Sequence, residues 1–353
     1  MKKIVKQAVG IDVAQDELVV CMGRMYEDLT LELYSHKTFG NTAKGFELLT
    51  NWVSKLSNAD VELIYVMEAT GVYHESLAYY LSDRGDRLSI VLPNKISNYS
   101  RTLDVRTVTD KTASEAITRF GLERKLDNWE PPKGVYRSLR QLTRERDQVV
   151  ATRTIAKNQL HAEEAEAYPN KRSIARTKKH IAFLDKQEQE IKEELAQMIK
   201  EDEEVKRIVV LLCSLPGIGL LTAATILGET NGFDLIRNKR QLSSYAGLDV
   251  KEKQSGTSVK GKPRISKKGN RYLRKAMHLP ALTAIRHDER FKAIFARIVS
   301  KHGIKMKAAV AIQRKLLEMA YTLYKRQEKY DSQYLNKSED KIAVEITELS
   351  IKN

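Results

Sequence analysis

Residues 135–207 contain no glycine and only one proline, Pro169, and this span constrains the fold more than any other feature of the sequence. Lysine, arginine, glutamate, glutamine and alanine dominate it, and apolar residues recur at helical spacing on both sides of the proline. The pattern predicts two long helices in an antiparallel hairpin or coiled coil, with the turn near residues 167–173. Such a hairpin serves either as a spacer or as a dimerisation surface, and the sequence does not decide between them.

The predicted hairpin, residues 131–207, separates two regions of different character. The region before it, residues 1–130, has three early apolar strands and then strands and helices in alternation, which predicts an α/β domain with a mixed sheet. The region after it, residues 208–330, is helical and basic, and residues 331–353 form a polar tail. The predicted strands cover residues 4–14, 16–25, 29–39, 61–70 and 88–93, and the predicted helices between them cover residues 42–56 and 74–85.

Charge and cysteine content indicate which kind of partner and which compartment to expect for this protein. The 353 residues carry a formal net charge of +15, which favours a polyanionic partner, nucleic acid before membrane. Only Cys21 and Cys213 are present, too few for a disulfide framework or a typical zinc site, so a reducing cytoplasm is expected. The N-terminal apolar run is broken by Lys6, Gln7 and Asp12 and is not a signal peptide. No stretch reaches the roughly 18 apolar residues that span a bilayer.

Three carboxylates stand at positions where they could form a metal site. Asp12 ends an apolar strand, Glu68 ends another, and Asp110 lies just before or within the first turn of a helix. If they converge at the strand ends, their oxygens suit one or two Mg²⁺ ions of the kind that bridge to phosphate. The commoner role of such aspartates is as helix caps or turn residues. Glu68 is harder to explain in that way, because a carboxylate at the end of a buried strand requires a partner.

The third region opens with an apolar helix, the turn Pro-Gly-Ile-Gly and a second apolar helix. This is the pattern of a helix-hairpin-helix, in which the amides around Gly217 and Gly219 bind a phosphate at the N-terminus of the second helix. An ordinary tight turn between core helices fits equally well, because the surrounding residues are apolar.

Residues 254–274 form a basic stretch with seven lysines and arginines, three serines and no acidic residue. Its glycines and proline exclude a continuous helix and predict a loop that leads into a helix starting near Asn270. Ser255 and Ser258 lie in this loop, where a serine usually only hydrogen-bonds its own backbone. The loop's cations are expected to contact nucleic-acid phosphates in a salt-dependent way; they are Lys260, Lys262, Arg264, Lys267, Lys268, Arg271 and Arg274.

Taken together, these segments resemble a known family. The marks in the N-terminal region are VGIDVA, MEATGVY and TDKTASEAITRFG, and those in the C-terminal region are LPGIGLLTAATIL, YAGLDV, the basic stretch and KAMHLPALTAI. In this order and spacing the chain is similar to the DEDD transposases of bacterial insertion sequences, the "one-ten" group with its "one-one-one-one" subgroup. That group includes the bridge-RNA-guided recombinases and, more distantly, the Piv-type DNA invertases. The resemblance covers most of the chain.

The resemblance implies a RuvC-like, ribonuclease-H-type N-terminal domain, a coiled coil and a mainly α C-terminal transposase domain. It implies four carboxylates that bind a divalent metal, Mg²⁺, and Asp12, Glu68 and Asp110 match the first three. It also implies a serine nucleophile in the C-terminal domain, which falls on Ser255, with Ser258 as the alternative.

The chain departs from the family pattern at the fourth carboxylate. That carboxylate is expected three residues after the third, where this sequence has Ala113. Glu115 could replace it if the helix starts late, and Asp104 could replace it if the preceding loop folds back. Otherwise the site has three carboxylates, or this copy is impaired.

The resemblance further implies DNA donor and target ends as substrates, a structured non-coding guide RNA, and a homodimer or homotetramer in the bacterial cytoplasm, associated with the nucleoid. The predicted function is therefore that of a recombinase that excises and inserts its own mobile element. Two alternatives remain at this point: a structure-specific nuclease that hydrolyses DNA with water, and a nucleic-acid-binding protein without catalysis.

Overall fold

The computed structural model describes residues 2–69, 71–103, 107, 109–251, 254–255, 259–260 and 264–331. The chain forms two compact units, Met1–Pro131 and Pro132–Asn353, and each is described by itself. Among the helices in the described ranges, none combines the length and the apolar character that crossing a membrane requires. The predicted tail lies outside the described residues except for its first position, and the predicted division of the second unit at residue 207 stays a prediction.

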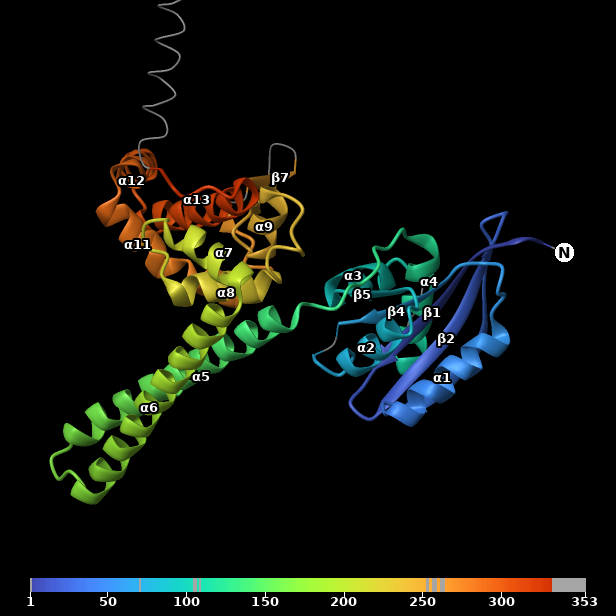
Figure 1. Ribbon diagram of the computed structural model, residues 1–353, viewed down its shortest axis with the longest axis horizontal. Coiled ribbons are helices and arrows are strands. Elements are labelled where there is room, and N and C mark those ends of the chain that lie inside the picture. The colour runs from blue at the N-terminus through green and yellow to red at the C-terminus, as the bar shows by residue number, and fades with distance from the viewer. Residues whose placement is uncertain are drawn as a thin grey trace, which may run out of the picture. The chain divides into compact units, whose positions relative to one another are not determined.

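The first unit is built on a five-stranded sheet in the order β3-β2-β1-β4-β5 (Figure 1). The first three strands are antiparallel neighbours, whereas β4 and β5 extend the sheet parallel to β1. This is the strand order of a ribonuclease-H-type domain, so the prediction of a RuvC-like α/β domain is confirmed. The strands are β1 (Ile4–Val13), β2 (Glu17–Tyr26), β3 (Leu31–Gly40), β4 (Leu63–Glu68) and β5 (Leu88–Val91).

Helices cover both faces of this sheet, which explains why its central strands are apolar runs rather than alternating ones. On one face, Phe46 of α1 (Ala43–Leu56) and Leu77 of α2 (Glu75–Asp83) join a core with Val9 and Ile11. The helices on the other face are α3 (Pro93–Ser100) and α4 (Asp110–Glu123), whose buried residues pack with Ala8, Ile64 and Val66. The first unit therefore has two apolar layers, one on each side of the sheet.

One glycine sets the distance between α4 and the sheet. A Cβ atom on Gly10 would lie 2.3 Å from Oγ1 of Thr118 and 2.6 Å from the carbonyl oxygen of Ser114, both on α4. The Gly10 amide instead donates to Oγ1 of Thr118 at 3.2 Å. Because only glycine allows this approach, α4 lies directly against β1, and Asp110 begins that helix.

The second unit begins with the predicted helical hairpin, formed by α5 (Gly134–Glu164) and α6 (Lys171–Glu201). Asn170 caps α6 by accepting from the amides of Arg172 and Ser173, which fixes the end of the turn. The remaining helices are α7 (Glu203–Cys213), α8 (Leu220–Thr230), α9 (Lys239–Tyr245), α10 (Arg271–Ala276), α11 (His278–His287), α12 (Glu289–His302) and α13 (Lys305–Arg326). The prediction of a mainly helical C-terminal part is confirmed.

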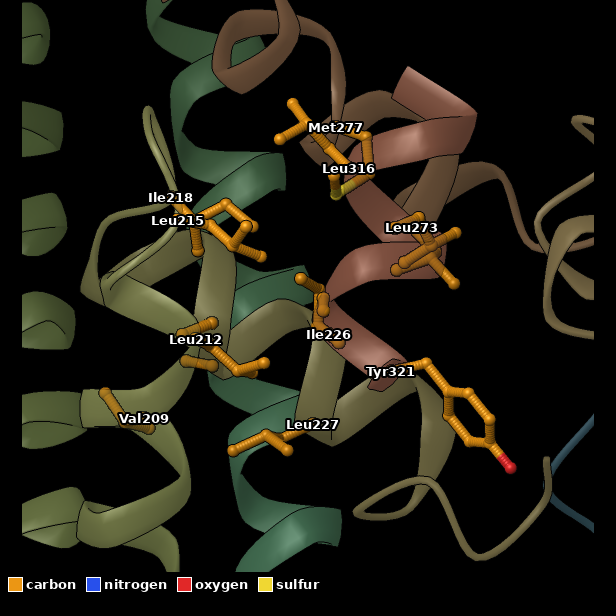
Figure 2. Packing of buried hydrophobic residues seen from close by; sticks show 14 of the residues in the cluster. Val209, Leu212, Leu215, Ile218, Ile226, Leu227, Leu273, Met277, Leu316 and Tyr321 are labelled. Carbon is orange, nitrogen blue, oxygen red and sulfur yellow. The ribbon is translucent and has the colours of Figure 1, made fainter. Parts of the chain in front are cut away.

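A single apolar core joins the base of the hairpin to these helices. It contains Leu139 of α5 and Leu195 of α6 together with Leu212, Ile226 and Leu316 from the helices that follow. Figure 2 shows part of this core, with side chains from α7, α8, α10 and α13 directed toward one another. The base of the hairpin is thus held by the same packing that holds the helices around the basic stretch.

Within the described part of the basic stretch, the backbone forms short strand pairs, which the sequence reasoning did not predict. β7 (Gln254–Ser255) pairs with β8 (Val259–Lys260), and β6 (Val250–Lys251) pairs with β9 (Arg264–Ile265). The helix predicted to start near Asn270 begins at Arg271, with Asn270 as its cap. The side chain of Asn270 accepts from the amide of Leu273 at 2.9 Å.

Candidate active site

Two of the three predicted carboxylates end neighbouring parallel strands. In the register of β1 and β4, Ile11 lies opposite Met67, and Asp12 and Glu68 each follow by one residue. Parallel strands present their carboxyl ends at the same edge of a sheet, where open α/β sheets typically bind ligands. The sheet therefore brings Asp12 and Glu68 to one edge, called here the carboxylate edge.

Asp110 reaches this edge from α4. Thr109 caps the helix by accepting from the amide of Thr112 at 3.2 Å, and the Thr112 hydroxyl in turn accepts from the amide of Thr109 at 2.8 Å. This reciprocal capping fixes the start of the helix at Asp110, where a carboxylate is favoured by the helix dipole. The close contact of α4 with Gly10 holds the helix against β1, two residues before Asp12.

The electrostatics of Asp12 show that the three carboxylates influence one another. Burial raises the pKa of Asp12, and the negative charges of Asp110 and Glu68 raise it further, to about 6. Two nearby like charges disfavour the ionised form of a carboxyl group, and a bound cation reverses that effect.

The donor chemistry of this edge fits a hard divalent cation, since Mg²⁺ takes oxygen ligands and is usually held by one or two carboxylates with phosphate and water. The side chains are not closed around such an ion. Among the described residues, no group of three or more His, Cys, Asp or Glu side chains stands close enough to hold a metal.

The position of the expected fourth carboxylate lies in the wall of a cavity. Ala113 and Glu68 both line this cavity, whose volume is about 650 Å³, together with Asn94, Ser97 and Arg101. An aspartate at Ala113 would extend toward the same space as Glu68. The substitution therefore removes a negative charge from the cavity beside the carboxylate edge and leaves room there.

Of the two substitutes considered for the fourth carboxylate, Glu115 is engaged away from this edge. Glu115 lies on the next part of α4, and its carboxylate pairs with Nε2 of His36 on β3 at 3.0 Å. Its charge is not among those that raise the pKa of Asp12. Asp104 lies outside the described residues.

The two glycines of the Pro-Gly-Ile-Gly turn in the second unit have different surroundings. Gly217 has φ +83°, and a Cβ atom there would lie 2.6 Å from the carbonyl oxygen of Pro280 on α11. Gly219, by contrast, caps α8 with open space around it. Close packing accounts for Gly217, and the amides that follow Gly219 are the ones a phosphate could reach.

The serine predicted as nucleophile lies in a short hairpin of the basic stretch. The backbone of Ser255 pairs with Val259 across β7 and β8. Ser258 and Lys262 lie outside the described residues. Lys260 is part of β8, and Arg264 begins β9 and is exposed.

Cations from the end of the basic stretch surround a second cavity, of about 630 Å³. Lys267 and Arg271 line it and are exposed, as is Lys268 nearby. Arg274 also lines the cavity, but its guanidinium donates to the carbonyl oxygen of Ala246 at 2.8 Å. The stretch therefore contains exposed cations suited to phosphate and one cation, Arg274, that is part of the fold.

A buried carboxylate below the basic stretch was missed by the sequence reasoning. Glu229 of α8 is 2% exposed and accepts from Nε and Nη2 of Arg144 at 2.7 and 2.8 Å. Its other donor is Nδ2 of Asn270, the cap of α10, at 2.5 Å. The hydroxyl of Tyr245 donates to its backbone oxygen at 2.8 Å. A lone glutamate in the apolar segment LLTAATILGET was the available signal, because such a group requires a partner.

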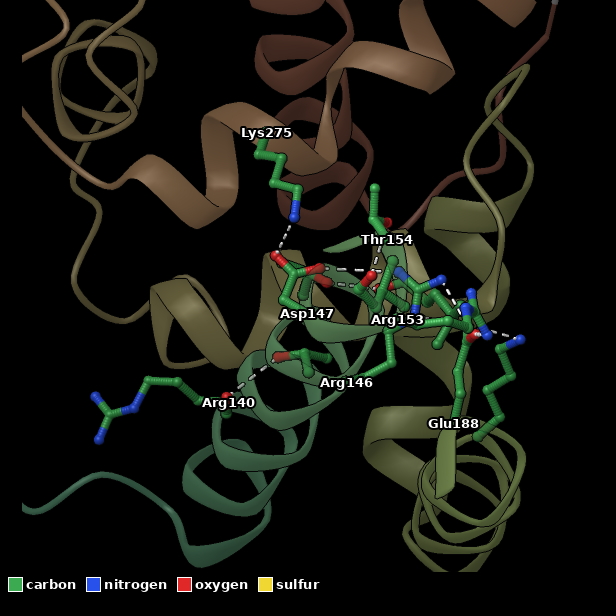
Figure 3. A network of polar contacts seen from close by, with 12 residues as sticks. Arg140, Arg146, Asp147, Arg153, Thr154, Glu188 and Lys275 are labelled. Carbon is green, nitrogen blue, oxygen red and sulfur yellow. Dashed lines mark hydrogen bonds and ion pairs between the residues drawn. The ribbon is translucent and has the colours of Figure 1, made fainter. Parts of the chain in front are cut away.

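A second set of ion pairs ties the hairpin together (Figure 3). Glu188 of α6, 4% exposed, is paired with Arg146 and Arg153 of α5 and with Lys192. Burial raises the pKa of Glu188, but hydrogen bonds from these cations outweigh it and lower the value to about 2. Figure 3 also shows Lys275 of α10 directed toward Asp147 of α5, at 3.0 Å.

Comparison with known proteins gives consistent results along the chain. Residues 9–169 match a family model described as a DEDD transposase of the IS110 type, and residues 209–296 match one described as the transposase IS116/IS110/IS902 family. The chain is 27% identical over 327 residues to the pilin gene-inverting protein of Moraxella lacunata, covering 92% of this chain and 98% of that one. It is 30% identical over 144 residues to the transposase for insertion sequence element IS1111A of Coxiella burnetii, covering 39% and 37%.

Among solved structures, the chain is similar to RuvC of T. thermophilus in complex with a Holliday junction substrate. The identity is 9% and the TM-score 0.25, with 32% of this chain and 90% of that one covered.

Proposed function

The chain belongs to the IS110/IS116/IS902 family of DEDD transposases, whose members cleave and rejoin DNA, and from this premise we propose that it excises and inserts a mobile insertion sequence. The observation that carries the proposal is the geometry of the carboxylate edge: the parallel strands β1 and β4 bring Asp12 and Glu68 to the same edge of a RuvC-like sheet, and the charge of Asp110 at the start of α4 reaches Asp12. A site that concentrates negative charge in this way is suited to a divalent cation and a phosphate.

In the proposed site, Asp12, Glu68 and Asp110 hold Mg²⁺. When bound, the ion supplies positive charge to the scissile phosphate and stabilises the charge that develops during attack. The hydroxyl of Ser255 loses its proton and forms a bond from Oγ to phosphorus, while one ester bond of the DNA backbone breaks and its oxygen takes up a proton. Because one phosphate ester replaces another, the serine link conserves the energy needed for rejoining. Ser258 is the alternative nucleophile.

The cations of the basic stretch are proposed to bind DNA. Lys267, Lys268 and Arg271 are exposed, and exposed cations on a loop neutralise DNA phosphates. The affinity of such binding falls as the salt concentration rises. The same role is proposed for Lys260, Lys262 and Arg264 and for the amides after Gly219, whereas Arg274 and Gly217 support the fold of this region. The net charge of +15 leaves enough basic surface for a structured guide RNA as well, which is proposed to select the DNA sites.

A dimer or tetramer is proposed, because joining two DNA sites requires more than one active site. The hairpin offers a surface for it: Ile155 is 59% exposed and Phe183 is 57% exposed. Apolar side chains at such positions on a helical hairpin suit contact with a second copy.

The decisive experiment traps the covalent link. The full-length chain is incubated with Mg²⁺, the RNA encoded beside its gene and a nicked suicide DNA that carries the end of its element. A protein–DNA adduct that disappears in Ser255→Ala but persists in Ser258→Ala supports the proposal. Cleavage without an adduct in every variant would identify a nuclease that uses water instead.

A second measurement tests the metal site independently of cleavage. Titration with Mn²⁺, followed by its paramagnetic resonance signal, is expected to show binding that Asp12→Asn weakens strongly. A non-catalytic nucleic-acid-binding protein is the second candidate, favoured by Ala113 in place of a carboxylate. It predicts neither Mn²⁺ binding nor an adduct, and salt-sensitive DNA binding alone.

A further inference from the structure

Three large apolar side chains project from the carboxylate edge into solvent. Val72 is 67% exposed, Tyr73 is 43% exposed and Leu92 is 54% exposed. The first two lie in the turn between β4 and α2, and the third lies between β5 and α3. We call them the apolar rim. Single exposed apolar residues are common on proteins, but three grouped beside charged carboxylates call for an explanation.

The rim flanks Glu68. In the register of β4 and β5, Glu68 lies opposite Val91, and Leu92 is the next residue after Val91. The amide of Ala69 donates to the carbonyl oxygen of Val91 at 2.9 Å, which keeps the two strand ends together beyond the last pair. Val72 and Tyr73 follow β4 within a few residues. The carboxylate therefore has apolar side chains beside it on two neighbouring connections.

Hydrogen bonds fix the part of the rim that carries Tyr73. Nδ2 of Asn41 donates to the carbonyl oxygen of Tyr73 at 3.1 Å and to that of Ala14 at 2.9 Å. Ala14 is two residues beyond Asp12, so one side chain ties the turn to the end of β1. The hydroxyl of Tyr73 also contacts Oε1 of Gln15 at 3.3 Å. An exposed aromatic ring is thus held in place beside the strand that carries Asp12.

The chemistry of this arrangement identifies its ligand. In DNA bound at the carboxylate edge, the bases next to the bound phosphate have flat apolar faces. An aromatic ring binds such a face by stacking, and a branched aliphatic side chain binds by insertion between base pairs. On the basis of the proposed function, we propose that the apolar rim separates and stacks the DNA bases next to the scissile phosphate. Val72 and Tyr73 act as the wedge on one side of Glu68, and Leu92 acts on the other.

The test compares two DNA probes in binding assays with the full-length chain, with Ca²⁺ replacing Mg²⁺. One probe is a short fluorescent duplex, and the other has the same sequence with a few mismatched pairs at its centre. A wedge gains affinity when the bases are already separated, so the wild-type chain is expected to bind the mismatched probe more tightly. Tyr73→Ala is expected to lose about five- to 100-fold of that preference, and Tyr73→Phe to retain it, because stacking requires the ring and not the hydroxyl.

Leu29→Ala is the matched control, because Leu29 is 73% exposed in the turn after β2, at the opposite end of the sheet. It is expected to leave the preference unchanged. Photo-crosslinking of the mismatched probe, with 5-iodouracil at its unpaired positions, is expected to attach DNA to Tyr73, as mapped by mass spectrometry. Circular dichroism establishes that each variant is folded.

The outcomes separate this inference from the function on which it depends. If Tyr73→Ala binds the two probes in the wild-type ratio, the wedge is wrong, whether or not the serine adduct forms. If the rim variants lower the mass of the oligomer and leave the ratio unchanged, the rim is a contact between copies of the chain, which also overturns it. If the ratio depends on Tyr73 but no adduct appears, the inference stands and the proposed chemistry fails.

Discussion

The buried carboxylates of the helical unit and the partly buried Asp12 of the first unit have opposite surroundings. In the helical unit, Glu229 and Glu188 are almost fully buried, and each is bound by arginine side chains. At the carboxylate edge, burial and then the charges of two other carboxylates raise the pKa of Asp12 to about 6, whereas the pKa of Glu188 falls to about 2. Pairing with arginine stabilises the fold of the helical unit. At the carboxylate edge the like charges repel one another, and a bound cation would relieve that repulsion.

This difference shows how structural and functional acids can be distinguished in the same chain. A carboxylate that only supports the fold gains from having its charge neutralised within the protein, since an unpaired buried charge is costly. A carboxylate that binds a metal gains from neighbours of its own sign, because they strengthen the attraction for a divalent ion. Four predictions test the contrast, from the largest expected effect to the smallest.

Asp12→Asn is expected to reduce DNA cleavage by about 100- to 1,000-fold, the usual loss when one charge-stabilising group is removed from an active site. The shape of the side chain is kept and only its charge is lost, so the variant should fold as the wild-type chain does. Asp16→Asn serves as the control, because Asp16 is exposed in the turn that follows β1. Cleavage of labelled DNA measures both. Equal activity of the two variants would show that Asp12 is not part of the active site.

Glu229→Ala is expected to destabilise the helical unit by about 3 kcal/mol, because Arg144 and Asn270 lose a buried partner. Urea unfolding followed by circular dichroism measures this, since helices dominate the second unit. Trp52 and Trp129 are the two tryptophans and both lie in the first unit, so their fluorescence should report an unchanged midpoint. A shift in the tryptophan signal instead would contradict the assignment of Glu229 to the helical unit's stability.

Asp12→Asn is also expected to change how the stability of the first unit depends on pH. The folded-state pKa of Asp12 is raised above its ordinary value of 3.8 to about 6, so the wild-type unit loses stability as pH rises through that interval. After allowance for solvent screening, the variant should gain about 1–2 kcal/mol of unfolding free energy near pH 8 and none near pH 3.5. Tryptophan-detected unfolding without metal measures it. Glu188→Gln, in the helical unit and therefore followed by circular dichroism, should show the opposite dependence and lose stability near neutral pH.

Ala113→Asp is expected to strengthen Mn²⁺ binding about tenfold, because it adds a charge to the wall of the cavity that Glu68 also lines. Ala113→Asn has nearly the same shape without the charge and is the matched control. Calorimetric titration gives both affinities. If the two variants bind Mn²⁺ equally, the position does not face the metal, and the missing carboxylate is supplied from elsewhere.

The sequence predicted most of what is local in this fold. The strands of the first unit and its helices other than α3 follow from hydrophobic pattern, whereas α3 was not predicted. The placement of Asp12 and Glu68 at one edge follows from the rule that parallel strands end together. The hairpin follows from a span without glycine. The paired strands of the basic stretch did not follow, because two-residue strands carry no periodicity.

Contacts between distant residues could not be predicted in the same way. Glu229 and Asn270 are 41 positions apart, and Asn41 joins Ala14 to Tyr73 across three connections. Such pairs depend on how the helices and strands pack, which one sequence does not specify. The turn residue Asn41 had no distinguishing neighbours in the sequence, although it positions the end of β1 relative to the turn after β4.

The distribution of buried residues along the hairpin has a consequence for how this chain can change over evolutionary time. Between Ala156 on α5 and Ile181 on α6, none of the side chains is buried, whereas Leu139, Leu142, Ile191 and Leu195 nearer the base belong to the helical core. Matched turns can therefore be inserted into or deleted from both arms beyond these positions without removing a fully buried side chain. The length of the hairpin can then be selected by what its tip contacts, while the packing at its base is required for folding.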